Sequence, residues 1–316
     1  MTVGGVLIVY ATAVGLAGAA GFRRAAWPLR APRLGATVVL AAAWSVPVAI
    51  VLAGLTVILP PSALFTDLGQ LVGACLVRLR AAYGTPAGAG IVTAGQVLSL
   101  ATVARVVWAV GRVAHRRRAQ RHRHRLLVRL AGGRRPDVPA VVLDCAGPAA
   151  WSVGGRRPAV VVTSGAVDLL SGPQLGAVLA HEHAHLRGRH HRLALAAALV
   201  AEALPLVPLL REAPARVGRL LEMDADERAA GLHEPRLLAG ALVAVTAAGG
   251  PAVGADGSSV GVTGAGGDAL ARVHRILRPP DRLPRRHEAL TRAAVVALTV
   301  TPLVLATAPA LVALLP

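Results

Sequence analysis

The chain has 316 residues, of which 54% are hydrophobic, and its 34 basic and 16 acidic residues give a formal net charge of +18. Its mean hydropathy of +0.58 excludes intrinsic disorder, and two cysteines are too few for the disulfide framework of a small secreted protein. We therefore predict an integral membrane protein, mainly α-helical, with a basic aqueous part.

Four apolar stretches are long enough to cross a lipid bilayer, which takes about 20 residues. They span residues 3–21, 34–60, 88–110 and 293–315. The first is followed, not preceded, by arginines, so we predict a membrane helix there and not a signal peptide. The predicted organisation is an N-terminal membrane region, a cytoplasmic domain and a C-terminal transmembrane helix, at residues 1–111, 112–287 and 288–316.

The distribution of arginine predicts the orientation, because cytoplasmic loops of membrane proteins carry an excess of positive charge. Residues 112–135 contain ten arginines and no acidic residue, whereas residues 61–87 contain two arginines and one aspartate. We expect the N-terminus outside the cell and the central domain in the cytoplasm. The arginine-rich segment has no aromatic residue to stack on a base, so we predict that it contacts membrane lipids and not nucleic acid.

The predicted cytoplasmic domain begins with strands and continues with helices. Short Val-rich runs bounded by Gly and Pro predict strands at residues 139–145, 149–153 and 159–163. Ser171 and Pro173 predict the start of a helix that continues with few interruptions to Leu204. Two further helices are predicted at residues 212–230 and 268–277, with a glycine-rich loop at residues 249–267 before the second. This pattern indicates an α+β domain with a small sheet.

A zinc-binding motif lies within the predicted helix that ends at Leu204. The sequence His181-Glu182-His183-Ala184-His185 has the form HExxH, which puts two histidines one turn apart on one helix face. Their ring nitrogens can therefore hold one Zn²⁺. Glu182 lies about 100° around the helix from His181, where it can take a proton from a zinc-activated water without binding the metal. The alternative is a helix whose His and Glu side chains simply face water.

A third ligand is predicted on the following helix, in the ExxxD pattern of Glu222 and Asp226. Pro205 and Pro208 break the preceding helix, and the segments on either side of the break are about 28 and 24 Å long. A helical hairpin over residues 193–222 therefore returns Glu222 to the two histidines. Their nitrogens and a Glu222 oxygen should lie about 3 to 4 Å apart, each about 2.1 Å from one metal centre. Asp226 can hold a liganding imidazole from behind.

The hairpin also explains an apolar stretch, residues 193–210, that hydropathy alone would assign as a fifth span. A complete crossing would separate Glu222 from the histidines, so we predict a re-entrant hairpin with Glu202 in a protected environment. Arg228 and His233 are candidates for stabilising the transition-state oxyanion. The other histidines and glutamates nearby are expected to face away from the metal, to pair with arginines or to form a basic interfacial collar: His183, His190, His191, Glu212 and Glu227.

The segment from Trp151 to Ala230 resembles the BlaR/MecR-type integral-membrane zinc peptidases and, more distantly, the HtpX and CAAX prenyl protease group. The resemblance is carried by LAHEHAHLRGRHHRL and EMDADERAA, which contain HExxH followed by ExxxD. It implies a gluzincin-like domain and a substrate that adds to the strand at residues 159–163. It also implies a set of functional residues: His181, His185 and Glu222 as zinc ligands, Glu182 as the catalytic glutamate and Asp226 as its supporting aspartate.

The resemblance further implies one zinc per chain, no small-molecule cofactor, and regulated proteolysis of a cytoplasmic or membrane protein, with a helix-turn-helix repressor as the candidate substrate. Antibiotic-sensing members continue into a penicillin-binding domain, whereas this sequence ends at Pro316, so we do not expect it to sense β-lactams. The alternatives are an HtpX-like quality-control protease, a catalytically silent membrane scaffold and a transporter that uses Arg105 and Glu202. The intact motif disfavours the scaffold, and the lack of inverted repeats disfavours the transporter.

Overall fold

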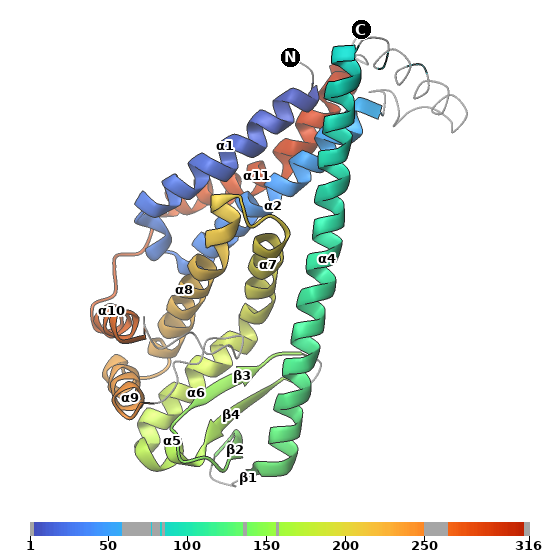
Figure 1. Cartoon of the computed structure of the whole chain (residues 1–316). Coiled ribbons are helices and arrows are strands. Elements are labelled where there is room, and N and C mark those ends of the chain that lie inside the picture. Colours follow the sequence, from blue (N-terminus) through green and yellow to red (C-terminus); the bar gives the residue numbers. More distant parts are fainter. Residues whose placement is uncertain are drawn as a thin grey trace.

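The computed structural model describes residues 3–58, 77, 83, 86–134, 138–155, 158–249 and 265–312. Most of the predicted connection over residues 61–87 and of the glycine-rich loop over residues 249–267 lies outside the described residues. Long helices stand above a small sheet (Figure 1). The helices are α1 (Val3–Arg24), the 3₁₀ turn η1 (Trp27–Leu29), α2 (Pro32–Ile58), α4 (Pro86–Ala131), α5 (Ser164–Leu169), α6 (Gly172–Arg187), α7 (His190–Ala203), α8 (Pro208–Ala230), α9 (Pro235–Ala247), α10 (Ala265–Leu277) and α11 (Arg285–Val312). The strands are β1 (Gly132–Arg134), β2 (Val141–Leu143), β3 (Ala150–Val153) and β4 (Ala159–Thr163).

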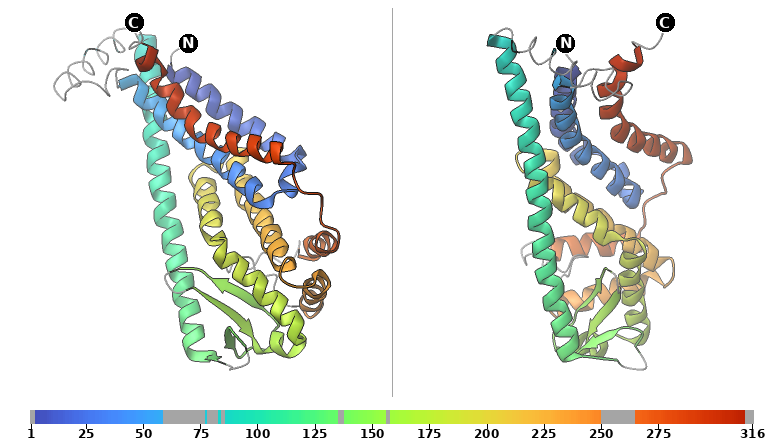
Figure 2. Two further views of the ribbon diagram at one scale, coloured as in Figure 1. Left: turned by 180° about the vertical axis from the view of Figure 1, so that it is seen from behind. Right: turned by 90° about the vertical axis from the view of Figure 1, so that its right-hand side faces the viewer.

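Four of the described helices, α1, α2, α4 and α11, are long and apolar enough to cross a membrane. They overlap the four predicted spans and suggest a membrane protein (Figure 2). The most buried of them is α2, which packs against the other three. Helix α4 differs from the expected span because it is 46 residues long and extends to Ala131, through most of the arginine-rich segment. No glycine or proline lies between Gly111 and Gly132 to interrupt it.

The sheet has four strands in the order β1-β2-β4-β3, with β2 and β4 parallel and the other two pairs antiparallel. The three predicted strands are present, and β1 adds a fourth at the end of α4. Valines of β2 and β4 pack against Leu179 and Leu186 of α6. The expectation that residues 159–163 form the substrate-receiving edge is wrong, because β4 is paired on both sides. Within the described residues, β1 and β3 are the two outer strands, and β3 contacts α6.

The single helix predicted from Pro173 to Leu204 is two helices, because the chain bends at Gly188 and Arg189. Arg189 has φ 52°, in the left-handed region, which costs a residue with a side chain about 1–2 kcal/mol. Gly188 is required by a close approach, since a Cβ there would lie 2.3 Å from Nε2 of His190. As a result α7 starts in a new direction, and its first side chain turns toward the end of α6.

Helices α7 and α8 form a hairpin whose turn lies between Ala203 and Pro208, as the two prolines predict. Its tip packs among the apolar helices, where Leu209 and Leu210 share a core with residues of α1 and α2 (Figure 1). Gly15 of α1 allows the close approach, since a Cβ there would lie 2.8 Å from Cγ1 of Val207. The predicted hairpin is therefore present, and its depth in a bilayer stays a prediction.

Arginines of α4 anchor the end of α7. Arg105 donates hydrogen bonds to the backbone carbonyls of Glu202 and Ala203, at 3.0 and 3.1 Å. Because α7 ends here, these carbonyls have no amide of a following helical turn to accept from. The same guanidinium lies over the ring of Trp108. Arg112 forms an ion pair of 2.9 Å with Glu202. Glu202 is therefore paired and partly buried, and its protection by a bilayer stays a prediction.

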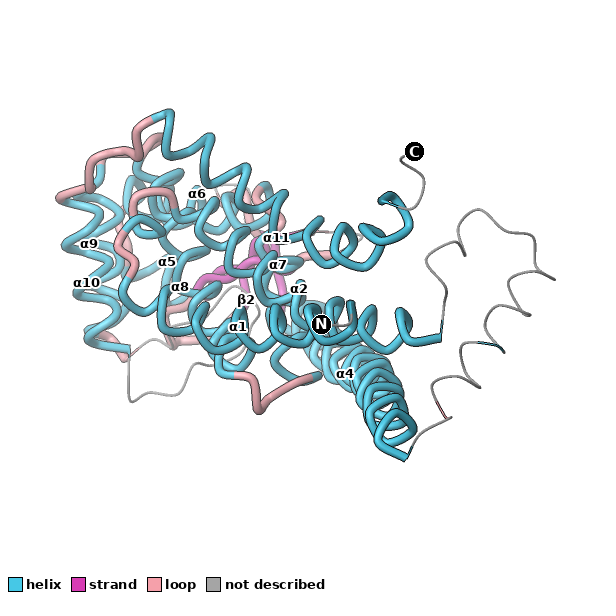
Figure 3. The backbone as a smooth tube through the Cα atoms, turned by 90° about the horizontal axis from the view of Figure 1, so that it is seen from above, coloured by secondary structure: helices cyan, strands magenta, loops and turns pink. Residues whose placement is uncertain are grey.

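Helices α9 and α10 lie on the opposite side of the molecule from α4 (Figure 3). They pack against each other and against α6 and α8. Leu238 of α9 and Ile276 of α10 join a small core with Ala177 of α6 and Ala229 of α8. This core brings α10 next to the final turns of α8.

A re-entrant hairpin predicts that its two ends face the same side of the membrane. In a chain whose native cysteines are replaced (Cys75→Ala, Cys145→Ala), we expect single cysteines at the exposed positions Arg187 and Arg219 to be protected from an impermeant thiol reagent in intact cells. Both should react after permeabilisation. Labelling of only one position in intact cells would mean that the segment crosses, and labelling of both would reverse the predicted orientation.

Candidate metal centre

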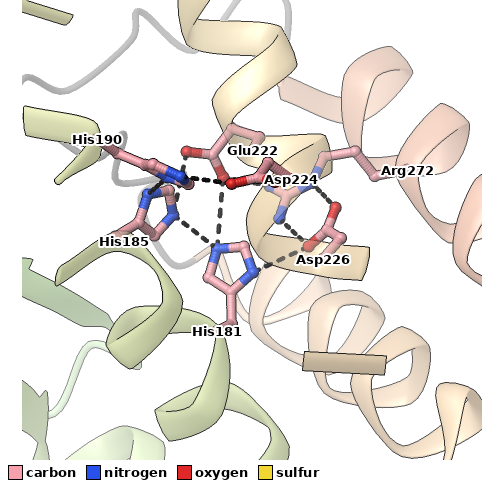
Figure 4. Close-up of polar contacts among 7 residues, drawn as sticks. All are labelled: His181, His185, His190, Glu222, Asp224, Asp226 and Arg272. Carbon is pink, nitrogen blue, oxygen red and sulfur yellow. Dashed lines mark hydrogen bonds and ion pairs between the residues drawn. The ribbon is translucent and has the colours of Figure 1, made fainter. Parts of the chain in front are cut away.

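Two histidines of α6 face each other where this helix meets α8 (Figure 4). His181 and His185 lie one turn apart, and their Nε2 atoms are separated by 3.0 Å. The two residues are only 6% and 3% exposed. Buried ring nitrogens need partners, because an unsatisfied polar group costs free energy away from water. The partners of these two rings define the centre.

Glu222 reaches the same point from α8. Its Oε2 lies 3.5 Å from Nε2 of His181, and its Oε1 lies 3.5 Å from Nε2 of His185. The three side chains offer ligand atoms that lie within 4.8 Å of one another and could hold a metal ion. The individual separations fall in the expected range of about 3 to 4 Å. The hairpin therefore brings Glu222 back to the two histidines.

The donor set fits Zn²⁺ in number, chemistry and spacing. Ligand atoms about 2.1 Å from a tetrahedral centre lie about 3.4 Å apart, close to the separations seen here. Two imidazoles and one carboxylate also leave a fourth position for water or substrate. Burial alone would lower the pKa of His181, but Asp226 and Glu222 raise it to about 10. The surroundings of this point therefore favour a positive charge.

Asp226 lies behind His181, as the ExxxD spacing predicts. Its Oδ1 is 2.9 Å from Nδ1 of His181, and its side chain is 3% exposed. An ionised carboxylate can only accept a hydrogen bond, so Nδ1 of the ring is the donor. Nε2, which faces Glu222, is then the ring nitrogen that a metal ion would bind in place of a proton.

The position of His190 contradicts the expectation that it belongs to a basic interfacial collar. The residue is completely buried, with Nδ1 at 2.9 Å from Nδ1 of His185 and Nε2 at 2.7 Å from Oδ2 of Asp224. That expectation assumed one continuous helix, whereas the bend at Gly188 and Arg189 turns the ring inward. A glycine within a helical pattern was the available signal for this bend.

Asp224 is a second acidic residue that sequence reasoning did not assign. Besides His190, it binds Nε of Arg228 at 3.0 Å and lies 3.7 Å from Nη1 of Arg33, at the start of α2. Burial alone would raise the pKa of Asp224, but the hydrogen bond to His190 and the charge of Arg228 hold it below its usual range. Arg228, which the sequence offered as a candidate for stabilising the transition-state oxyanion, is therefore paired with Asp224.

Arg272 of α10 provides a positive charge that sequence reasoning also missed. It donates two hydrogen bonds to Asp226, at 2.8 and 2.9 Å, and its Nη1 lies 3.2 Å from Oε2 of Glu222. Burial alone would raise the pKa of Glu222, but Arg272, His185 and His181 hold it well below its usual range. No local pattern marks this arginine, which lies 46 residues from its partner Asp226.

Glu182 is 7% exposed and adjoins both the centre and the sheet. Burial raises its pKa to about 7, against the charge of His181 and a hydrogen bond from Ser152 of β3. A carboxyl with a pKa near neutrality can both take up and release a proton at physiological pH. Glu182 is therefore suited to general acid–base chemistry.

The remaining candidates lie away from the point where the three ligand atoms meet. His183 contacts the carbonyl of Leu179 in its own helix at 2.7 Å, and His233 lies beside Gly176 of α6. The two glutamates expected to pair with arginines do so, namely Glu212 with Arg23 and Arg216, and Glu227 with Arg275. None of these contacts adds a ligand to the centre.

Comparison with known families bears directly on the activity. Residues 114–216 match the family model described as Peptidase family M48. The match supports an M48 family metallopeptidase. M48 peptidases are zinc metalloproteases, which agrees with the donor set. The matched segment includes the HExxH motif and ends before Glu222, and the narrower resemblance to BlaR/MecR or HtpX members stays a prediction. No curated protein and no solved structure matches the chain.

If the three converging residues are the ligands of a zinc site, the purified chain should bind one zinc. His181→Ala, His185→Ala and Glu222→Ala should each lose it, because three protein ligands leave no spare. Glu212→Ala, a change on the same helix as Glu222 but at a residue paired with arginines, is the matched control and should keep its zinc. Elemental analysis of the gel-filtered proteins gives the stoichiometry. Full zinc content in all three variants would contradict the ligand set.

Proposed function

We propose that the chain is a membrane-embedded zinc endopeptidase in which His181, His185 and Glu222 hold one Zn²⁺ and Glu182 activates the attacking water. The observation that carries this proposal is the convergence of three ligand atoms from two helices beside a buried glutamate. The M48 match supports peptidase chemistry independently of that geometry.

The chain's own residues supply the proton transfers and hold the geometry. Zinc, when bound, supplies a Lewis acid that polarises the scissile carbonyl and acidifies a water molecule. Glu182 takes the proton from that water and passes it to the nitrogen of the leaving amine. Its pKa of about 7 suits both steps. Asp226 and Arg272 keep the ring of His181 and the carboxylate of Glu222 in position.

The substrate lies along β3 in this proposal. This strand is one of the two outer strands of the described sheet, it contacts α6, and Ser152 on it donates a hydrogen bond to Glu182. An extended peptide that adds to a sheet edge is held by its backbone, with its carbonyls at regular spacing. A peptide added to β3 therefore runs close to Glu182. This geometry favours flexible or unfolded segments of a protein as substrates.

We also propose that the catalytic end of the molecule faces the cytoplasm of a cell-membrane protein whose N-terminus is outside. The arginine-rich part of α4 runs beside the sheet, at the end of the molecule that holds the candidate centre (Figure 1). Positive charge of this kind marks the cytoplasmic side and attracts anionic lipid headgroups. The exposed Arg118 is suitable for that contact.

The resemblance to BlaR/MecR-type peptidases suggests a helix-turn-helix repressor as the substrate, cleaved as part of a regulatory response. An HtpX-like role would use the same centre on damaged membrane proteins. The two proposals differ in substrate and not in chemistry. A catalytically silent scaffold differs from both because it would not need Glu182 as a base.

Changing Glu182 to Gln tests the catalytic proposal. Gln keeps the shape of the side chain and can still bind Ser152, but it cannot take a proton from water, so we expect a loss of about 10²- to 10⁴-fold in cleavage rate with zinc content unchanged. The assay is cleavage of casein, an unfolded chain, by the purified protein in lipid nanodiscs. Glu234→Gln, at the exposed N-cap position that precedes α9, is the control. Cleavage by the Glu182 variant at the wild-type rate would remove this residue from the mechanism.

A further inference from the structure

A continuous line of contacts runs from the start of α2 to the second histidine of the centre. Arg33 lies 3.7 Å from Asp224, which binds Nε2 of His190 at 2.7 Å. Nδ1 of His190 is in turn 2.9 Å from Nδ1 of His185. His190 is fully buried and Asp224 is 7% exposed, so water cannot readily replace these contacts. Figure 4 shows His190 beside the ring of His185, joined by a dashed line to Asp224.

The chemistry of these groups fixes where the hydrogens lie. The carboxylate of Asp224 only accepts, so Nε2 of His190 carries the hydrogen. A neutral imidazole has one donor and one acceptor nitrogen, so Nδ1 of His190 is then the acceptor. The hydrogen between the two Nδ1 atoms therefore belongs to His185. This leaves a lone pair on Nε2 of His185, which is the atom that faces Glu222 and His181.

We propose that Asp224 and His190 are positioning residues that set the tautomer and the ring orientation of His185 as a zinc ligand. The inference rests on the proposed function, because it assigns a role to residues around the same metal. The ExxxD motif accounts for Asp226, which contacts the ring of His181 directly. The inference adds the residues that contact the ring of His185. Both ligand imidazoles then have a carboxylate behind them, one directly and the other through an intervening histidine.

The backbone is arranged so that His190 can occupy this place. The bend between α6 and α7 puts Arg189 in the left-handed region, a conformation found mostly where the surrounding structure demands it. A Cβ on Gly188 would lie 2.3 Å from Nε2 of His190 and 2.9 Å from the carbonyl oxygen of Ala184. Neither the ring nor the helix backbone can yield easily, so an alanine at position 188 would displace His190.

Arg33 and Arg228 contact Asp224, the carboxylate that binds His190. Arg228 binds Asp224 at 3.0 Å, and Arg33 also donates a hydrogen bond to the carbonyl of Gly188 at 3.2 Å. Through Arg33, the first turn of a membrane helix contacts both Asp224 and the bend that orients His190. The ring of His185 is therefore positioned from outside its own helix.

Zinc affinity of the full-length chain in lipid nanodiscs, measured by chelator competition, tests the proposal. His190→Leu removes donor and acceptor together and should weaken zinc binding about 10- to 100-fold. His190→Gln keeps one donor and one acceptor on a single amide and should restore most of the affinity. His183→Leu is the matched control, because the contact described for His183 is to the carbonyl of Leu179 in its own helix, and it should bind zinc as the wild type does.

A double substitution distinguishes positioning from packing. If Asp224 acts through His190, Asp224→Ala should weaken zinc binding, and adding it to His190→Leu should cause no further loss. Visible absorption of the cobalt(II)-substituted protein gives a second readout, with a changed spectrum in the Leu variant and a wild-type spectrum in the Gln variant. Gly188→Ala should weaken zinc binding although it replaces none of Arg33, Asp224, His190 and His185. Gly218→Ala, where a Cβ meets nothing within 4 Å, should leave zinc binding unchanged.

The outcomes separate this inference from the proposed function. Wild-type zinc affinity in His190→Leu, together with zinc loss in His181→Ala, would overturn the positioning role and leave the metal centre intact. Equal weakening in the Leu and Gln variants would also overturn it, because it would indicate a packing role. A wild-type chain that binds no zinc would instead overturn the proposed function.

Discussion

Two histidines on one helix cannot make a catalytic metal centre, because a third protein ligand has to reach the same point from another element. In this protein that requirement is met by a hairpin. The chain leaves the site along α7, turns among the apolar helices and returns along α8, which brings Glu222 to within 3.5 Å of both imidazoles. The hairpin can do this only because it packs tightly against α1 and α2 and is held by Arg105 of α4. The long apolar helices therefore help to position the site.

The second constraint is the burial of charge. Glu182, Asp224 and Asp226 are less than 10% exposed, and Glu222 is 18% exposed, yet buried carboxylates are stable only when paired or hydrogen-bonded. The arginines that pair with three of them come from three parts of the chain: Arg33 from α2, Arg228 from α8 and Arg272 from α10. Glu182 has no such ion pair among the described contacts, and burial raises its pKa to about 7. The acid to which we assign the proton transfer is thus the one of these four with no described ion pair to an arginine.

Sequence reasoning recovered the parts of this arrangement that depend on local patterns. The apolar spans, the HExxH pair, the hairpin turn at Pro205 and Pro208 and the return of Glu222 follow from hydropathy, helix periodicity and helix rise. The missing parts depend on tertiary contacts. His190 was misplaced because a single bend at Gly188 changes the direction of α7, and Arg272 lies on α10, far along the chain from Asp226. The role of β4 was misjudged because strand order, unlike strand position, is set by pairing between segments distant in sequence.

The central claim is that two imidazoles of α6 and a carboxylate of α8 share one metal ion. X-ray absorption at the zinc edge of the purified, metal-loaded chain tests this claim directly, because it reports the type and distance of the ligand atoms. The account predicts a four-coordinate zinc with two imidazole nitrogens and two oxygens at about 2.0–2.2 Å. A shell containing sulfur at about 2.3 Å, or one without imidazole scattering, would contradict it.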